Sequence, residues 1–136
     1  MSSNAIGIVA IGRNEGERLL RCLQSLAPHG APVVYVDSAS TDGSADNAAR
    51  LGASVLPLDM ARPFTAARAR AEGFDLLLAQ HPAMALVMFV DGDCEVEPGW
   101  LADASRFMQA NPAYAATCGR RRERFPDASF YNRLAD

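Results

Sequence analysis

Two carboxylates, Asp91 and Asp93, flank a glycine directly after the apolar run of residues 84–90. Residues two apart share one side of an extended backbone, so both carboxylates could face one hard cation, or a phosphate-bearing ligand through that cation. Gly92 between them would allow a ligand to approach the backbone closely. The alternative is that the two carboxylates only end a strand in a solvated turn.

The apolar run before these carboxylates, MALVMFV, is short, continuous and partly β-branched. Such a run is typical of a strand buried on both faces in a parallel sheet. Ligands of α/β proteins collect where the strands end and the loops begin. We therefore expect Asp91 and Asp93 to point into a crevice.

The rest of the chain alternates between strand and helix patterns. Earlier strands are expected over residues 5–11, 33–37 and 53–59, the last at a sheet edge because it contains Pro57. Four helices are expected. The first runs from the turn at 12–15 to about Ala27, and the second from a cap at Thr41 or Asp42 to Leu51. The third covers 64–80, beginning near Thr65, and the fourth covers about 99–109, before an extended segment at 114–119. This order indicates right-handed βαβ units, and hence an α/β fold with a mainly parallel, Rossmann-like sheet.

Composition limits the class of protein. The 136 residues suit a single domain over 1–136, with hydrophobic and charged shares of 49% and 21% that are ordinary for a soluble protein. The net charge of −3 gives no reason to expect nucleic-acid binding, and no run reaches the roughly 18 apolar residues of a transmembrane segment. The N-terminus lacks a secretory pattern, and the three cysteines fit neither a disulfide framework nor a zinc site, so we expect a cytoplasmic protein.

Two common nucleotide-binding loops are excluded. The residues after the first expected strand, GRNEGE, lack the three glycines of the dinucleotide fingerprint. All thirteen cationic side chains are arginine, so no Walker lysine exists.

Other polar groups follow the earlier strands: Asn14 and Glu15 after the first and Asp37 after the second. With Asp91 and Asp93 they should lie along one sheet edge. A nucleotide across that edge could place its base and ribose near the first two strands and its phosphates near the fourth. A divalent ion held by Asp93 would neutralise those phosphates, because the acid pair alone would repel them.

Two of these residues, and two arginines of the helix expected over 64–80, also have a structural alternative. Arg68 and Arg70 could reach a phosphate, or could form a solvated helix face. Asp37 could cap the turn after its strand, and Glu15 could complement a helix N-terminus.

Five segments together resemble the N-terminal half of a family 2 glycosyltransferase with the GT-A fold: IVAIGRNE, VVYVDSASTDGS, AARARAEGFD, FVDGDCEVEPGWL and GRRRERFPDASFYNRLAD. The resemblance implies a three-layer sandwich, incomplete at its C-terminus. It implies an inverting transferase that uses a nucleotide-diphosphate sugar, most often a UDP-sugar, with Mn²⁺ or Mg²⁺. The acceptor would be a saccharide, a lipid-linked molecule or another compound.

The resemblance also implies roles for individual residues. Asp37 would contact the base or ribose, Arg70 would lie near the phosphates or sugar, and Asp93 with Asp91 would hold the metal. The nucleotide-sugar site would comprise Ile11, Arg13, Asn14, Glu15, Asp37, Ser38, Arg70, Asp91 and Gly92.

The family domain normally continues beyond this length, so the resemblance implies a catalytic base beyond Asp136. The chain would then be a fragment, or a noncatalytic nucleotide-sugar-binding module. The arginines of residues 120–124 could meet an anionic acceptor or the inner face of the membrane, or form a solvated basic turn. A third hypothesis, prompted by Asp-Gly-Asp after an apolar strand, is a phosphatase with an aspartate nucleophile, although that chemistry usually places its pair after the first strand.

Overall fold

The computed structural model describes residues 6–136 and contains a four-stranded, all-parallel sheet in the order β3-β2-β1-β4. Its strands and intervening helices alternate along the chain: β1 (Ile6–Gly12), α1 (Glu17–Leu26), β2 (Val33–Asp37), α2 (Ser44–Arg50), β3 (Ser54–Pro57), α3 (Ala66–Gln80) and β4 (Leu86–Asp91). The expected α/β class, the parallel sheet and the edge position of the Pro57 strand are confirmed. Ala5, the expected first strand residue, lies outside the described part.

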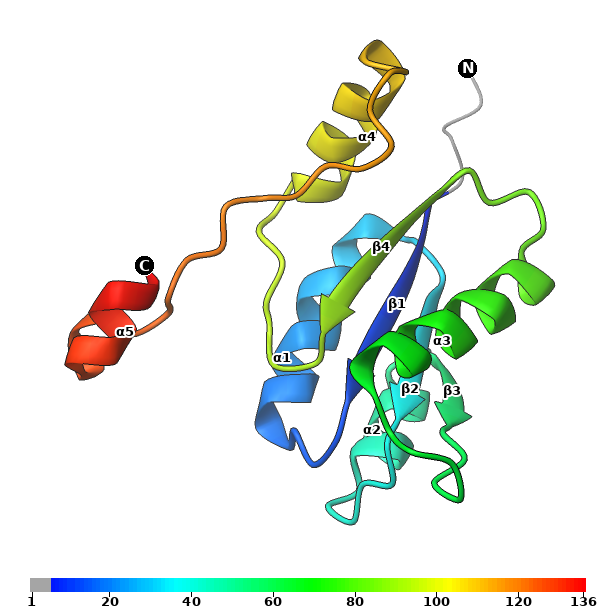
Figure 1. The fold of residues 1–136 in the computed structure, drawn as a ribbon, viewed down its shortest axis with the longest axis vertical. Helices are drawn as coiled ribbons and strands as arrows, with labels where there is room; N and C mark the ends of the chain where they lie inside the picture. The colour runs from blue at the N-terminus through cyan, green and yellow to red at the C-terminus, as the bar shows by residue number, and fades with distance from the viewer. Residues whose placement is uncertain (1–5) are drawn as a thin grey trace. The chain divides into compact units, whose positions relative to one another are not determined.

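The chain divides into two compact units, the first ending at Leu101 and the second covering Ala102–Asp136. In the first unit, α1 and α2 cover one face of the sheet and α3 covers the other (Figure 1). Side chains of β1 alternate between the two faces: Ile8 and Ala10 pack toward α1, and Val9 and Ile11 pack toward α3. Because both faces of β1 are covered, this strand lies at the centre of the core.

Helix α3 packs closely on the sheet because it carries a glycine where it crosses β1 and β2. A Cβ atom at Gly73 would lie 2.6 Å from methyl carbons of both Val9 and Val36. The helix starts where the sequence indicates, since the Thr65 hydroxyl accepts a hydrogen bond of 3.0 Å from the Arg68 amide. This packing sets the height of α3 above the sheet, and with it the position of Arg70.

Three expectations about individual elements were wrong. β4 is not buried on both faces: none of its six residues is fully buried, and Phe89 is 45% exposed. Helix α2 has Gly43 at its N-cap, and the Asp42 carboxylate accepts a hydrogen bond of 3.0 Å from the amide of Ser44, the first residue of the helix. Residues 114–119 form no strand, and all of them are exposed.

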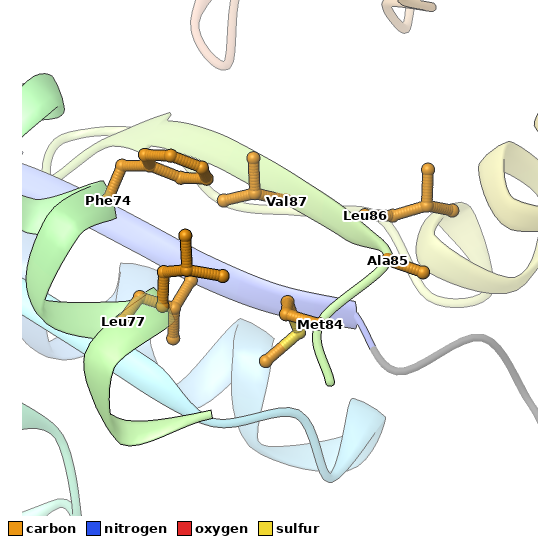
Figure 2. Close-up of a pocket in the computed structure, with 7 residues that line it drawn as sticks. Phe74, Leu77, Met84, Ala85, Leu86 and Val87 are labelled. Atoms are coloured by element: carbon orange, nitrogen blue, oxygen red, sulfur yellow. The ribbon is translucent and has the colours of Figure 1, made fainter. Parts of the chain in front are cut away.

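A small apolar pocket lies between α3 and the beginning of β4 (Figure 2). Phe74 and Leu77 approach it from the helix, and Met84 and Val87 from the strand segment. All its lining residues are apolar, and it lies at the opposite end of β4 from Asp91. The pocket is therefore separate from the carboxylates of the strand ends.

The second unit contains most of α4 (Trp100–Ala110), a short 3₁₀ turn (Pro126–Ala128) and α5 (Phe130–Ala135). The Ser129 hydroxyl caps α5 by accepting a hydrogen bond of 3.1 Å from the Asn132 amide. Part of the basic segment 120–124 is folded back on the chain end, since Arg122 lies 3.7 Å from Asp136. Among the described helices, none is long and apolar enough to cross a membrane.

Replacing Gly73 with alanine tests the close packing of α3. Alanine favours the helix by about 0.8–1 kcal/mol, but its methyl group must displace two stiff β-branched side chains, which costs about 1–3 kcal/mol. We expect a net loss of about 1 kcal/mol in the free energy of unfolding, measured by urea denaturation. Ala79→Leu, an added side chain at an exposed position of the same helix, should change it by less than about 0.5 kcal/mol. A Gly73→Ala protein as stable as the parent would contradict this packing.

Candidate functional site

The ends of three neighbouring strands carry the candidate site. In the register of the sheet, Asp37 pairs with Gly12, and Asp91 pairs with Ile11. Adjacent strands are about 4.8 Å apart, so the backbones at Asp37 and Asp91 lie roughly 10 Å apart on either side of β1. The structure therefore brings these strand ends to one edge, as the strand order indicates.

The two carboxylates nevertheless project from opposite faces of the sheet. Paired residues of parallel strands point to the same face, and the partners of Asp37 and Asp91 are consecutive residues of β1. Asp37 projects on the side of α1 and α2, like Tyr35, whereas Asp91 projects on the side of α3, like Ile11. A ligand that touches both must therefore pass over the end of β1.

Asp91 is paired with Arg70 of α3. An Nη atom of Arg70 lies 2.6 Å from Oδ1 of Asp91, and the two side chains are 37% and 53% exposed. A pair this accessible contributes at most about 1 kcal/mol to stability, because solvent and salt screen it. The pair therefore matters mainly because it places a cationic group directly beside the carboxylates after β4.

Residues Asp91 to Cys94 form a turn, which corrects the expectation of an extended backbone. The Cys94 amide donates a hydrogen bond of 2.9 Å to the Asp91 carbonyl, which leaves Gly92 and Asp93 at the centre of the turn. The Gly92 amide donates to the Ile11 carbonyl at 2.8 Å, and a Cβ atom at Gly92 would lie 3.0 Å from that oxygen. The glycine thus allows close approach to β1, and Asp93 is left exposed to solvent.

The described residues contain no group of three or more histidine, cysteine or acidic side chains that could hold a metal ion. A cation ligated by protein groups alone therefore does not fit this edge. Mg²⁺ is commonly bound through only one or two carboxylates together with substrate phosphates. The exposed carboxylates of Asp91 and Asp93 fit that shared type of site.

Asp37 is 5% exposed, and both of its carboxylate oxygens accept hydrogen bonds. Its Oδ1 accepts from the hydroxyl of Tyr35 at 3.2 Å, and its Oδ2 accepts from the amide of Ser40 at 2.9 Å. The bond from Ser40 is the turn-capping contact considered as an alternative from the sequence. Ser38, also buried, continues the sheet pairing through its amide, which donates to the Gly12 carbonyl at 3.0 Å.

The loops after β1 and β2 are held together by three hydrogen bonds. The Asn14 amide donates to Ser40 Oγ at 2.9 Å, the Thr41 amide to Asn14 Oδ1 at 2.7 Å, and the Gly16 amide to Asp42 Oδ2 at 2.9 Å. The neighbouring Ser44 side chain and the hydrogen bonds from the Ser44 and Gly16 amides lower the pKa of Asp42. Asn14 therefore shapes the edge by joining the two loops.

Sequence reasoning missed Tyr35, Ser40 and Asp42 as members of this edge. The turn-forming composition of SASTDGS signalled a loop, but no sequence pattern indicated which side chains would bridge to the loop after β1. The bridge depends on Asn14 adopting a left-handed backbone, with φ of 53°. Asparagine tolerates this conformation better than most residues do.

The remaining predicted residues lie around the end of β1. Ile11 is buried toward α3, Arg13 is exposed, and Glu15 is half-buried with its Oε2 2.8 Å from Arg18. Arg68 neither reaches this edge nor forms a solvated face. Its guanidinium, with the side chain 12% exposed, binds the Glu72 carboxylate at 2.7 Å and three carbonyl oxygens of the segment before α3, those of Asp59, Arg62 and Pro63.

Substitutions at Asn14 test whether backbone conformation and side-chain bond both hold the loops. Asn14→Ala loses the bond to Thr41 and also strains a left-handed position, whereas Asn14→Gly loses only the bond. We expect the alanine variant to be less stable than the glycine variant by about 1 kcal/mol in the free energy of unfolding. Equal stability of the two variants would show that the left-handed backbone is not a constraint.

Comparison with known proteins gives the family of the chain. The family described as Glycosyl transferase family 2 matches residues 8–135, a span that includes all four strands after the first two residues of β1. A search of curated proteins returned no match. The match gives no support to the phosphatase hypothesis, and it agrees with the parallel sheet of a Rossmann-like GT-A fold. This chain belongs to glycosyltransferase family 2.

Proposed function

We propose that this domain binds a nucleotide-diphosphate sugar across the end of β1 and transfers the sugar to an acceptor with inversion at the anomeric carbon. Family membership gives the glycosyltransferase activity in general terms. The observation that carries the more specific proposal is the placement of Asp37 and Asp91 on either side of β1 at one sheet edge. The nucleoside would lie at Asp37 and the diphosphate at the turn after Asp91.

The surroundings of Asp37 limit what can bind there. A carboxylate only accepts hydrogen bonds, and each of its oxygens retains accepting capacity beyond the bonds from Tyr35 and Ser40. A ligand group at Asp37 must therefore present an N–H or O–H donor. A ribose hydroxyl meets this condition, and so does the ring N–H of uracil, so a UDP-sugar is compatible with this site.

The turn after β4 suits the diphosphate. Arg70 could turn its guanidinium from Asp91 toward a phosphate, because the ion pair is accessible to solvent. Asp91 and Asp93 would share Mn²⁺ or Mg²⁺ with the phosphate oxygens. When bound, such a cation stabilises the negative charge of a departing nucleoside diphosphate.

For transfer, an acceptor hydroxyl attacks the anomeric carbon, loses its proton to a general base, and displaces the nucleoside diphosphate. None of the residues placed at this edge is assigned as that base, so their proposed role is confined to the donor and leaving group. The proposed acceptor is a saccharide or lipid-linked molecule, met in the cytoplasm or at the inner face of the membrane. The basic segment 120–124 supports an anionic surface or acceptor.

Calorimetry with UDP and Mn²⁺ tests the donor site. Asp93→Ala should weaken metal-dependent UDP binding by at least about tenfold, because one of only two carboxylate ligands is lost. Asp75→Ala, which removes an exposed carboxylate from α3, should leave binding unchanged. If Asp93→Ala binds UDP with the same metal dependence as the parent, the donor-site assignment is wrong.

A donor-hydrolysis assay separates a catalytic domain from a noncatalytic binding module. A general base typically contributes about 10² to 10⁴-fold to the rate, and none is assigned among the residues at this edge. We therefore expect this chain to release UDP from a UDP-sugar slowly, with Mn²⁺, and to lose that release in Asp93→Ala. Tight UDP binding without any release would instead favour the noncatalytic module.

A further inference from the structure

Tyr35 places a hydroxyl group in an otherwise apolar part of the core. The residue is fully buried and belongs to the apolar cluster on the α1 side of the sheet, which also contains Ile8 and Leu19. The hydroxyl lies 3.2 Å from Oδ1 of Asp37, two residues further along the same strand. A buried hydroxyl requires a partner, and here the partner is the carboxylate proposed to bind the nucleoside.

The phenol can act only as a donor toward this carboxylate. Burial raises the pKa of Tyr35, and the negative charge of Asp37 raises it further. The phenol therefore keeps its proton throughout the ordinary pH range. The hydrogen bond to Asp37 is thus present wherever the carboxylate is ionised.

The end of β1 is built around this hydroxyl. A Cβ atom at Gly12 would lie 3.2 Å from the Tyr35 oxygen, so the glycine leaves room for the phenol. On its other side the Asp37 carboxylate accepts a hydrogen bond from the Ser40 amide, and the Ser40 hydroxyl oxygen accepts one from the Asn14 amide. The carboxylate is held from both sides, by the core through Tyr35 and by the joined loops through Ser40.

We infer that Tyr35 is a positioning residue that fixes the carboxylate of Asp37 for binding the nucleoside of the donor. This inference rests on the proposed function. Tyr35 does not touch the ligand, because its side chain is fully buried. Phenylalanine at this position would fill the same space, but it would leave Oδ1 of Asp37 without its donor and the carboxylate held from one side only.

The test is calorimetry of Tyr35→Phe with three probes: UMP, UDP, and pyrophosphate with Mn²⁺. UMP carries the nucleoside, pyrophosphate reports only on the metal and diphosphate part, and UDP carries both. We expect UMP and UDP to bind more weakly by the same factor, roughly tenfold, and pyrophosphate binding to be unchanged. Tyr131→Phe, which removes a hydroxyl from an 80% exposed side chain, should affect none of the three probes.

Asp37→Asn separates failure of this inference from failure of the proposed function. If Asp37→Asn abolishes UMP and UDP binding while Tyr35→Phe changes neither, the positioning role is wrong and the nucleoside site stands. If Tyr35→Phe weakens pyrophosphate as much as UMP, the tyrosine has only a general structural role, which also overturns the inference. Unchanged UMP binding in Asp37→Asn would contradict the nucleoside site itself, and the inference with it.

Discussion

The parallel pairing of β1 with β2 on one side and β4 on the other determines where every candidate group lies. The register aligns Asp37 with Gly12 and Asp91 with Ile11, at the end of β1, a strand whose two faces are both covered. Side chains of β1 are held by apolar clusters on both faces, so a shift of register would expose one of these clusters. Stability of the core and geometry of the site therefore depend on the same backbone hydrogen bonds.

The end of β1 also needs small residues on both sides of the site. Gly12 makes room for the Tyr35 hydroxyl, and Gly92 lets the turn after β4 bond directly to the Ile11 carbonyl. The adjoining loops are then joined through Asn14, whose left-handed backbone aims its amide and side chain at the loop after β2. An edge held in this way requires little reorganisation when a nucleotide binds, which favours affinity.

Much of this arrangement could be predicted from the sequence. The alternation of strand and helix patterns along the chain predicts a parallel sheet, and the carboxyl ends of parallel strands lie at one edge. The face of the sheet from which each carboxylate projects could not be predicted. Whether Asp37 and Asp91 project together or apart depends on a register offset of one residue along β1. The exposure of Phe89 was missed because an apolar run does not reveal how completely helices cover each face of its strand.

Binding of the donor across the end of β1 can be tested by an amide NMR titration of the chain with UDP and then Mn²⁺. We expect UDP to shift the amides of residues 38–40, and Mn²⁺ then to broaden those of Gly92 and Asp93 most strongly. The amides of Ala85 and Leu86, at the opposite end of β4, should keep their intensity. Broadening centred on Ala85 and Leu86, or no shift at residues 38–40, would contradict a donor bound across the end of β1.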